Sequence, residues 1–258
     1  MFNLLISLLS GTVVGTLTGF LLGLPVAGVI PGLLVFGICF FFIAKRIGNM
    51  VTAEMNLLVP MLQARKIKEA ETHLLGMRRR YGRWQFMLAG QMDAQRGMIR
   101  YMHTEFDDAM PLLQAGKFRN WAALVSIGCI HFRRDRKDEA WKAFEKASTA
   151  ASKEPMVYVV WAILLTRDGK RPRALEVMSR AQKAIPDNAI LTSLLDSIAN
   201  RKKINTSKLP ESWFQFFPEE LRAQMVKGRR GGPPANVQYR EAPFPQPNKS
   251  SKKMRRGG

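Results

Sequence analysis

The first 44 residues of the chain contain no Asp, Glu, Lys, Arg or His. A bilayer core is crossed by about 20 helical residues, whereas one straight helix over residues 2–44 would extend about 65 Å. The chain is therefore expected to turn, and Leu24-Pro25, with Pro31 nearby, is the favoured place. These features predict a transmembrane helical hairpin over residues 1–46.

The residues that flank the apolar stretch predict its orientation. Lys45 and Arg46 follow it directly, and the positive-inside rule places them in the cytoplasm. A hairpin returns the chain to the side on which it began. We therefore expect a multi-pass protein of a bacterial-type inner (plasma) membrane with both termini cytoplasmic. A cleaved signal peptide is the competing interpretation, but it requires a basic start and a shorter apolar segment than the one that follows Met1-Phe2-Asn3.

Glycines recur every four residues in the first apolar segment and so lie close to one helix face. In lipid, small residues stabilise helix pairs because they let the two backbones approach closely. We predict that this stripe packs the two spans against each other; the alternative is that it joins copies of the chain into a homo-oligomer. The glycines assigned to transmembrane packing are Gly11, Gly15, Gly19, Gly23, Gly28 and Gly32.

The rest of the chain is strongly basic. Forty Lys and Arg stand against twenty Asp and Glu, which gives a formal net charge of +20. Such an excess favours acidic protein, anionic lipid or nucleic acid as partners. The cysteines show no pairing pattern, which favours a reducing compartment, and the histidines show no metal-ligand spacing, so we expect no metal and no cofactor. These residues are Cys39, Cys129, His73, His103 and His131.

Beyond residue 48 the apolar residues follow a helical period, and part of the sequence repeats itself. Small and large apolar residues recur 34 positions apart in two segments, at Ala140 and Ala174, Phe144 and Met178, Ala147 and Ala181, Ile127 and Trp161, and Gly128 and Ala162.

This pattern resembles the tetratricopeptide repeat (TPR), a 34-residue helix–turn–helix unit, with Pro186 at the family's proline position. The resemblance implies stacked helix pairs, with a concave face of first helices that binds proteins or peptides. Leu124 and Tyr158 replace the usual tryptophan, and His131 and Leu165 occupy a usual tyrosine position.

The predicted fold class is all-α: a two-helix transmembrane hairpin, a TPR-like α-solenoid and a disordered basic C-terminal tail. The predicted regions are the hairpin, degenerate helical repeats, TPR-like repeats with a capping helix, an aromatic capping or docking segment, and the tail. Their bounds are 1–46, 47–120, 121–203, 204–226 and 227–258.

One basic residue also recurs at the repeat period. Arg133, Arg167 and Arg201 are 34 positions apart, near the ends of three successive first helices. A row of arginines suits a carboxylate or phosphate, and neighbouring Phe132 would add an apolar contact. We therefore predict that the row binds an acidic peptide of a partner. The alternative is that these arginines are solvated and only favour the helix macrodipole.

Two aromatic segments carry further predictions. RRRYGRW (78–84) is expected to be a solvated helix end, or a contact with lipid headgroups or RNA. Residues 209–226 are predicted to fold back over the open end of the solenoid or to dock another protein, and Pro218 marks a helix start within them. The aromatics concerned are Trp213, Phe214, Phe216 and Phe217.

The last segment has no apolar periodicity and is predicted to be disordered. From residue 227 it carries nine Lys and Arg against one Glu, which suits anionic lipid, RNA or a purely solubilising role. Because no complete set of catalytic residues is present, we expect a non-enzymatic scaffold that binds proteins or peptides at the membrane. The alternative is an RNA- or ribosome-associated membrane factor that uses the basic tail.

Overall fold

The computed structural model describes residues 1–85 and 87–229, and every regular element in these ranges is a helix. The chain divides into two compact units, Met1–Val157 and Tyr158–Gly258. Residues 230–258 lie outside the described residues, and the prediction of a disordered tail falls mostly on them. The α-helices are α1 Phe2–Leu21, α2 Val29–Asn56, α3 Leu58–Gln63, α4 Ile67–Tyr81, α5 Leu88–Met102, α6 Phe106–Ala115, α7 Trp121–Arg133, α8 Lys137–Ala150, α9 Pro155–Arg167, α10 Arg171–Ala184, α11 Ala189–Ala199 and α12 Pro218–Arg229.

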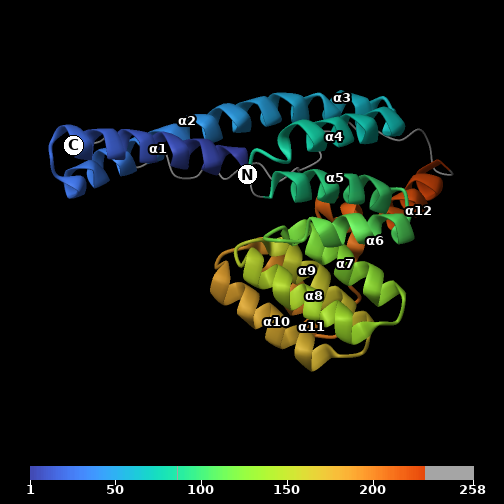
Figure 1. Cartoon of the computed structure of the whole chain (residues 1–258). Helices are drawn as coiled ribbons and strands as arrows, with labels where there is room; N and C mark the ends of the chain where they lie inside the picture. The colour runs from blue at the N-terminus through green and yellow to red at the C-terminus, as the bar shows by residue number, and fades with distance from the viewer. Residues whose placement is uncertain (86, 230–258) are drawn as a thin grey trace, which may run out of the picture. The chain divides into compact units, whose positions relative to one another are not determined.

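Helices α1 and α2 form an antiparallel hairpin (Figure 1). The turn between them contains the short 3₁₀ helix Pro25–Gly28, at the predicted position. Both helices are long and apolar enough to cross a membrane. Helix α2 does not end at the predicted boundary at residue 46 but continues to Asn56, and no proline lies between these two positions to interrupt it.

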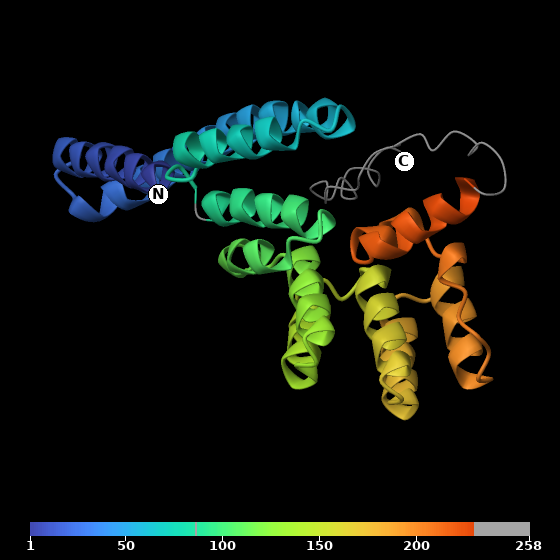
Figure 2. The ribbon, with the colours of Figure 1, turned by 90° about the vertical axis from the view of Figure 1, so that its right-hand side faces the viewer.

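Unit 1 continues from the hairpin into a small apolar core. Helix α4 lies along the second half of α2 (Figures 1 and 2), and its apolar face is buried there. Helix α5 also contributes to this core. Beyond it, α5 pairs with α6, and α7 pairs with α8. Gly128 on α7 shows why a small residue is needed in such a pair, because a Cβ at this position would lie 2.8 Å from the Phe144 ring.

Five helix ends beyond the hairpin, in the part of the chain that the structure describes, share one turn geometry. After α3, α5, α7, α9 and α11, a residue with positive φ is followed by a residue whose N–H donates to the carbonyl five positions earlier. This is the Schellman motif, which satisfies carbonyls at a helix end. The predicted degenerate region 47–120 therefore uses the same turn as the region 121–203, where the 34-residue spacing occurs. The positive-φ residues are Arg65, Thr104, Asp135, Gly169 and Arg201.

Helix positions also recur at a constant period. The first helices α7, α9 and α11 begin at Trp121, Pro155 and Ala189, which are 34 residues apart. The second helices α8 and α10 begin 34 residues apart as well, at Lys137 and Arg171. The repeat read from the sequence thus corresponds to a repeat of helix bounds.

The C-terminal part of unit 2 follows α11 through two short 3₁₀ helices, Thr206–Lys208 and Glu211–Gln215, and then α12. The predicted helix start at Pro218 is where α12 begins. Because α12 continues to Arg229, the predicted boundary between cap and tail at residue 227 falls inside a helix.

Candidate functional site

The glycines of the hairpin bring the two apolar helices into backbone contact. A Cβ added to Gly11 would lie 2.6 Å from the Gly32 carbonyl oxygen, and one added to Gly15 would lie 2.9 Å from the Gly28 carbonyl oxygen. A Cβ on Gly28 would overlap the Gly15 carbonyl. Gly19 lies against Pro25 in the same way. Any larger residue would separate the helices here, so these five glycines form the seam of the hairpin.

Gly23 differs from the prediction that assigned it to this packing. A Cβ on Gly23 would meet nothing within 4 Å, and the residue has φ +62°. It lies two residues beyond the end of α1, at the positive-φ position of a Schellman turn. Its spacing in the sequence predicted that Gly23 lies on the glycine stripe, but α1 ends at Leu21.

The outer surface of the hairpin is apolar and exposed. Leu9, Phe20 and Val26 each expose at least 70% of their surface. A soluble protein of this size rarely leaves such a surface in water. Exposed apolar helix faces of this kind are typical of helices that cross a membrane.

The open end of the hairpin is joined to a loop that lies 80 residues later in the sequence. The backbone N–H of Phe2 donates to the Arg83 carbonyl over 2.9 Å, and that of Asn3 donates to the Trp84 carbonyl over 3.2 Å. The Met1 ammonium also donates to the Arg83 carbonyl. The Gln85 amide donates to the Ala44 carbonyl over 3.1 Å, at the end of the apolar part of α2. The loop thus satisfies the first N–H groups of α1 and contacts both helices of the hairpin at its open end.

Next to this loop, Glu54 joins α2 to α4. Its Oε1 accepts hydrogen bonds from Arg80 Nη1 over 2.6 Å and from the Tyr81 hydroxyl over 2.7 Å. His73 lies 3.7 Å from the other carboxylate oxygen. These contacts fix the C-terminal part of α2 against α4.

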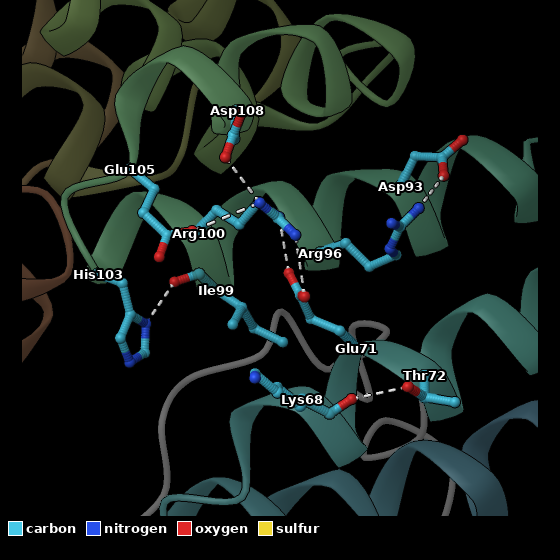
Figure 3. Close-up of polar contacts among 10 residues, drawn as sticks. All are labelled: Lys68, Glu71, Thr72, Asp93, Arg96, Ile99, Arg100, His103, Glu105 and Asp108. Carbon is cyan, nitrogen blue, oxygen red and sulfur yellow. Dashed lines mark hydrogen bonds and ion pairs between the residues drawn. The ribbon is translucent and has the colours of Figure 1, made fainter.

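Arg100 on α5 holds three helices together (Figure 3). Its Nε and Nη2 contact the two carboxylate oxygens of Glu71 on α4 at 2.8 and 3.1 Å. Its Nη1 lies 2.8 Å from Asp108 on α6 and 3.5 Å from Glu105. The Glu71 hydrogen bond is the main cause that raises the pKa of Arg100. This network was not predicted, because no local pattern joins residues so far apart in sequence.

The first arginine of the predicted row is engaged inside unit 1. Arg133 Nη1 donates to the Tyr101 hydroxyl over 2.7 Å. Its guanidinium lies 5.5 Å from the Tyr101 ring centroid and 4.9 Å from that of Phe106, in cation–π geometry. Phe132 lies against Trp141, with ring centroids 5.7 Å apart. Both side chains therefore contact residues of unit 1.

The second arginine, Arg167 at the end of α9, is engaged inside unit 2. Its Nη2 donates to Glu220 Oε1 over 2.7 Å, and Trp213 Nε1 donates to Glu220 Oε2 over 2.9 Å. The guanidinium lies over the rings of Trp213 and Phe217, which stack on each other at 4.1 Å. Burial alone would raise the pKa of Glu220, but these hydrogen bonds and the Arg167 charge lower it below its usual value. The acidic group that this arginine was predicted to bind in a partner is thus supplied by α12.

The aromatic segment is largely buried. Trp213, Phe216 and Phe217 are at most 4% exposed, and Phe214 is half-buried. The contacts of Arg167 with Glu220, Trp213 and Phe217 hold this segment beside the end of α9. In this conformation the buried rings are not available to dock another protein.

The third arginine is not structurally equivalent to the other two. Arg133 and Arg167 are the last residues of their helices, whereas α11 ends two residues before Arg201. Arg201 has φ +54° and is the exposed positive-φ residue of the Schellman turn. The sequence period continues at this position, but the shorter helix moves Arg201 into the turn.

The first helices also differ from the expected open concave face. Residues 122–130 of α7 and 156–165 of α9 are all buried. A helix that is apolar on every side is a core helix. The exposed side chains of the repeats lie on α8, on α10 and on one face of α11.

The histidines and cysteines are separate from these clusters or serve structural contacts. His73 lies beside Glu54, the ring of His103 contacts the Ile99 carbonyl at 2.9 Å, and Cys129 is buried. In residues 1–85 and 87–229 no group of three or more His, Cys, Asp or Glu is arranged to hold a metal ion.

No protein-family model matches the chain, and a search of the curated proteins returned no significant match. Its function is therefore inferred from its own residues and their geometry.

Proposed function

We propose that this chain is a membrane-anchored, TPR-like scaffold that binds a protein or peptide partner at the cytoplasmic face of a bacterial-type inner membrane. The hairpin is the anchor, with both of its ends on the cytoplasmic side. The helix pairs beyond it provide the binding surface. The basic tail contributes affinity for acidic partners or for the lipid surface.

The observation that carries this proposal is the continuity of α2. The helix begins in the apolar hairpin and continues without a break to Asn56, where it is held by Arg80 and Tyr81 of α4. A rigid connection of this kind fixes the first helix pairs close to the bilayer rather than leaving them on a flexible linker. Such an arrangement suits a protein that positions partners at a membrane.

The TPR-like character is supported by the constant helix period and the shared Schellman turn. Repeats of this kind bind partners through exposed helix faces. Since α7 and α9 are buried, we propose a partner surface for each unit by itself: α8 in unit 1, and α10 with the exposed face of α11 in unit 2. The arginine row is not its centre, because Arg133 and Arg167 already have ligands within their own units.

The test places a photo-crosslinking amino acid at one exposed position on each proposed helix. Suitable sites are Lys142 on α8, Arg173 on α10 and Thr192 on α11, with Leu33 on the hairpin as the control. The proposal predicts that one protein crosslinks from at least two of the three sites, but not from Leu33, and that crosslinking survives nuclease.

Two results would contradict it. Crosslinks that disappear with nuclease would favour the RNA- or ribosome-associated alternative. Digestion of the helix pairs by protease added outside intact spheroplasts would show that they are not cytoplasmic.

A further inference from the structure

The loop Gly82–Gln85 is held at the open end of the hairpin by hydrogen bonds to both spans. It contacts Phe2 and Asn3 at the start of α1, and Ala44 at the end of the apolar part of α2. The 20 residues of α1 extend about 30 Å, which is the thickness of the hydrocarbon core. The start of α1 therefore lies at the boundary between hydrocarbon and headgroups, and so does the loop.

Three basic residues lie next to the residues that form these hydrogen bonds, or among them. Lys45 and Arg46 follow Ala44 on α2, Arg83 lies in the loop, and all three are exposed. In the described part of the chain, no carboxylate lies within ion-pair distance of any of them. Nearby arginines differ in this respect, because Arg78 pairs with Asp93 and Arg80 pairs with Glu54.

Two aromatic rings lie beside these charges. Phe2 and Trp84 contact each other edge to face, with centroids 5.9 Å apart. Phe2 is 45% exposed, and Trp84 is half-buried against the core of unit 1. Aromatic side chains of this kind favour the headgroup level of a bilayer.

We propose that Lys45, Arg46, Arg83, Phe2 and Trp84 form a collar that binds the headgroups of anionic phospholipids. The basic groups contact the lipid phosphates, and the two rings lie at the ester level beside them. This inference rests on the proposed membrane anchor, because it needs the hairpin in a bilayer. It adds a ligand, anionic phospholipid, and a binding site, the collar, that a membrane anchor does not by itself require.

The position of the collar favours lipid over RNA. Lys45 directly follows Ala44, the last residue of the apolar segment, and the loop is hydrogen-bonded to Ala44 through Gln85. A phosphate that reaches these side chains must therefore lie in the headgroup layer. Phospholipid phosphates are present there at high local concentration, whereas RNA would have to displace them.

The experiment compares lipid selectivity of the purified full chain and its variants. The chain in detergent is titrated with dioleoyl phosphatidylglycerol and, separately, with dioleoyl phosphatidylcholine, and bound lipids are counted by native mass spectrometry. The parental chain should prefer the anionic lipid. Each basic residue near the surface is worth about five-fold in affinity, so K45Q/R46Q/R83Q should reduce the preference by up to about a hundred-fold.

A matched variant controls for total charge. K142Q/K146Q/K153Q removes the same charge from exposed positions of unit 1 outside the collar and should keep the parental preference. K45R/R46K/R83K keeps the charge and should also keep the preference. If the triple glutamine variant is unfolded by circular dichroism, R83Q alone is used and should lose about five-fold.

The outcomes separate the collar from the anchor. Every variant should still float with phosphatidylcholine vesicles after an alkaline wash, because the anchor is the apolar hairpin; failure of the parental chain to float would contradict the proposed function itself. The collar is overturned if the floating parental chain shows no preference for the anionic lipid. It is also overturned if the matched control loses as much preference as the collar variant, if free glycerophosphate competes as well as the lipid does, or if the collar mutations abolish RNA binding instead.

Discussion

Glu220→Gln tests whether the contact between Arg167 and α12 holds the aromatic segment in place. In the parental chain the carboxylate accepts one hydrogen bond from Arg167 and one from Trp213. A glutamine has a single acceptor oxygen, so one of the two donors would face an NH₂ group. The side chain at 220 also loses the charge that complements Arg167.

The expected cost follows from these contacts. A hydrogen bond to a charged group contributes about 1.5–3 kcal/mol. The Glu220 side chain is only 23% exposed, so water replaces the lost bond poorly. Loss of one such bond, at about 2 kcal/mol, raises the open population of the segment about 30-fold.

Hydrogen exchange measures this opening directly. Amides in residues 209–222 should exchange about 30-fold faster in the variant when opening is in rapid equilibrium. The Phe217 amide, which donates to the Trp213 carbonyl over 3.2 Å, is the most direct reporter. Glu211→Gln is the matched control, because it removes an exposed carboxylate two residues before Trp213 and should change exchange less than two-fold.

The reasoning is refuted if Glu220→Gln exchanges within two-fold of the parental chain. Burial of the rings alone would then hold the segment.

The pH dependence gives a second measurement of the same contact. The folded pKa of Glu220 is lowered, since the hydrogen bonds from Arg167 and Trp213 outweigh the effect of burial. A carboxyl group with a lowered folded pKa stabilises the fold above its unfolded pKa of about 4.3. The contribution is lost as the pH falls through the folded pKa. Protection of residues 209–222 should therefore fall below about pH 4.3, and Glu220→Gln should remove this part of the pH dependence.

Three further substitutions test the packing in the two regions of unit 1. Gly28→Ala should separate the hairpin helices and lower the resistance of the hairpin to SDS unfolding by a few kcal/mol. Gly37→Ala on α2, where a Cβ meets nothing within 4 Å, should not, and equal effects would contradict the seam. Gly128→Ala should lower the free energy of unfolding, measured by chemical denaturation, by about 1–3 kcal/mol. Gly76→Ala, in an open helical position, should raise it by up to about 1 kcal/mol. A stabilised Gly128 variant would show that the Phe144 ring moves aside. Arg100→Gln should cost about 2 kcal/mol, because it leaves the acidic groups of α4 and α6 without their shared cation, and a thermal midpoint equal to that of the parental chain would contradict this.

Much of the helical organisation follows from local patterns. The segment up to residue 44 has no charged residue, and a turn was expected within it at Leu24-Pro25. These features predicted two long apolar helices, and the structure has them. The start of α12 at Pro218 was predicted from the residues around it. These features depend on hydropathy, periodicity and backbone restriction, which act over a few residues.

The sequence could not identify the ligands of its own basic residues. Arg133, Arg167 and Arg201 share one period, yet the first lies on Tyr101, the second binds Glu220, and the third caps a turn. The sequence also gave no signal that residue 83 would lie beside residue 2. Composition and period say which residues are present and how often they recur, not which partner is nearest.

The sequence by itself therefore determined the helices, the apolar hairpin, the 34-residue spacing and the basic excess. Only the tertiary structure decided that Gly23 belongs to a turn and that α2 continues to Asn56. It also decided that Glu220 of α12 forms the ion pair with Arg167. The physical reason is distance along the chain. Helix formation and hydrophobicity are properties of neighbouring residues, whereas a salt bridge or a loop anchor is chosen among many competing groups that only the folded chain brings together.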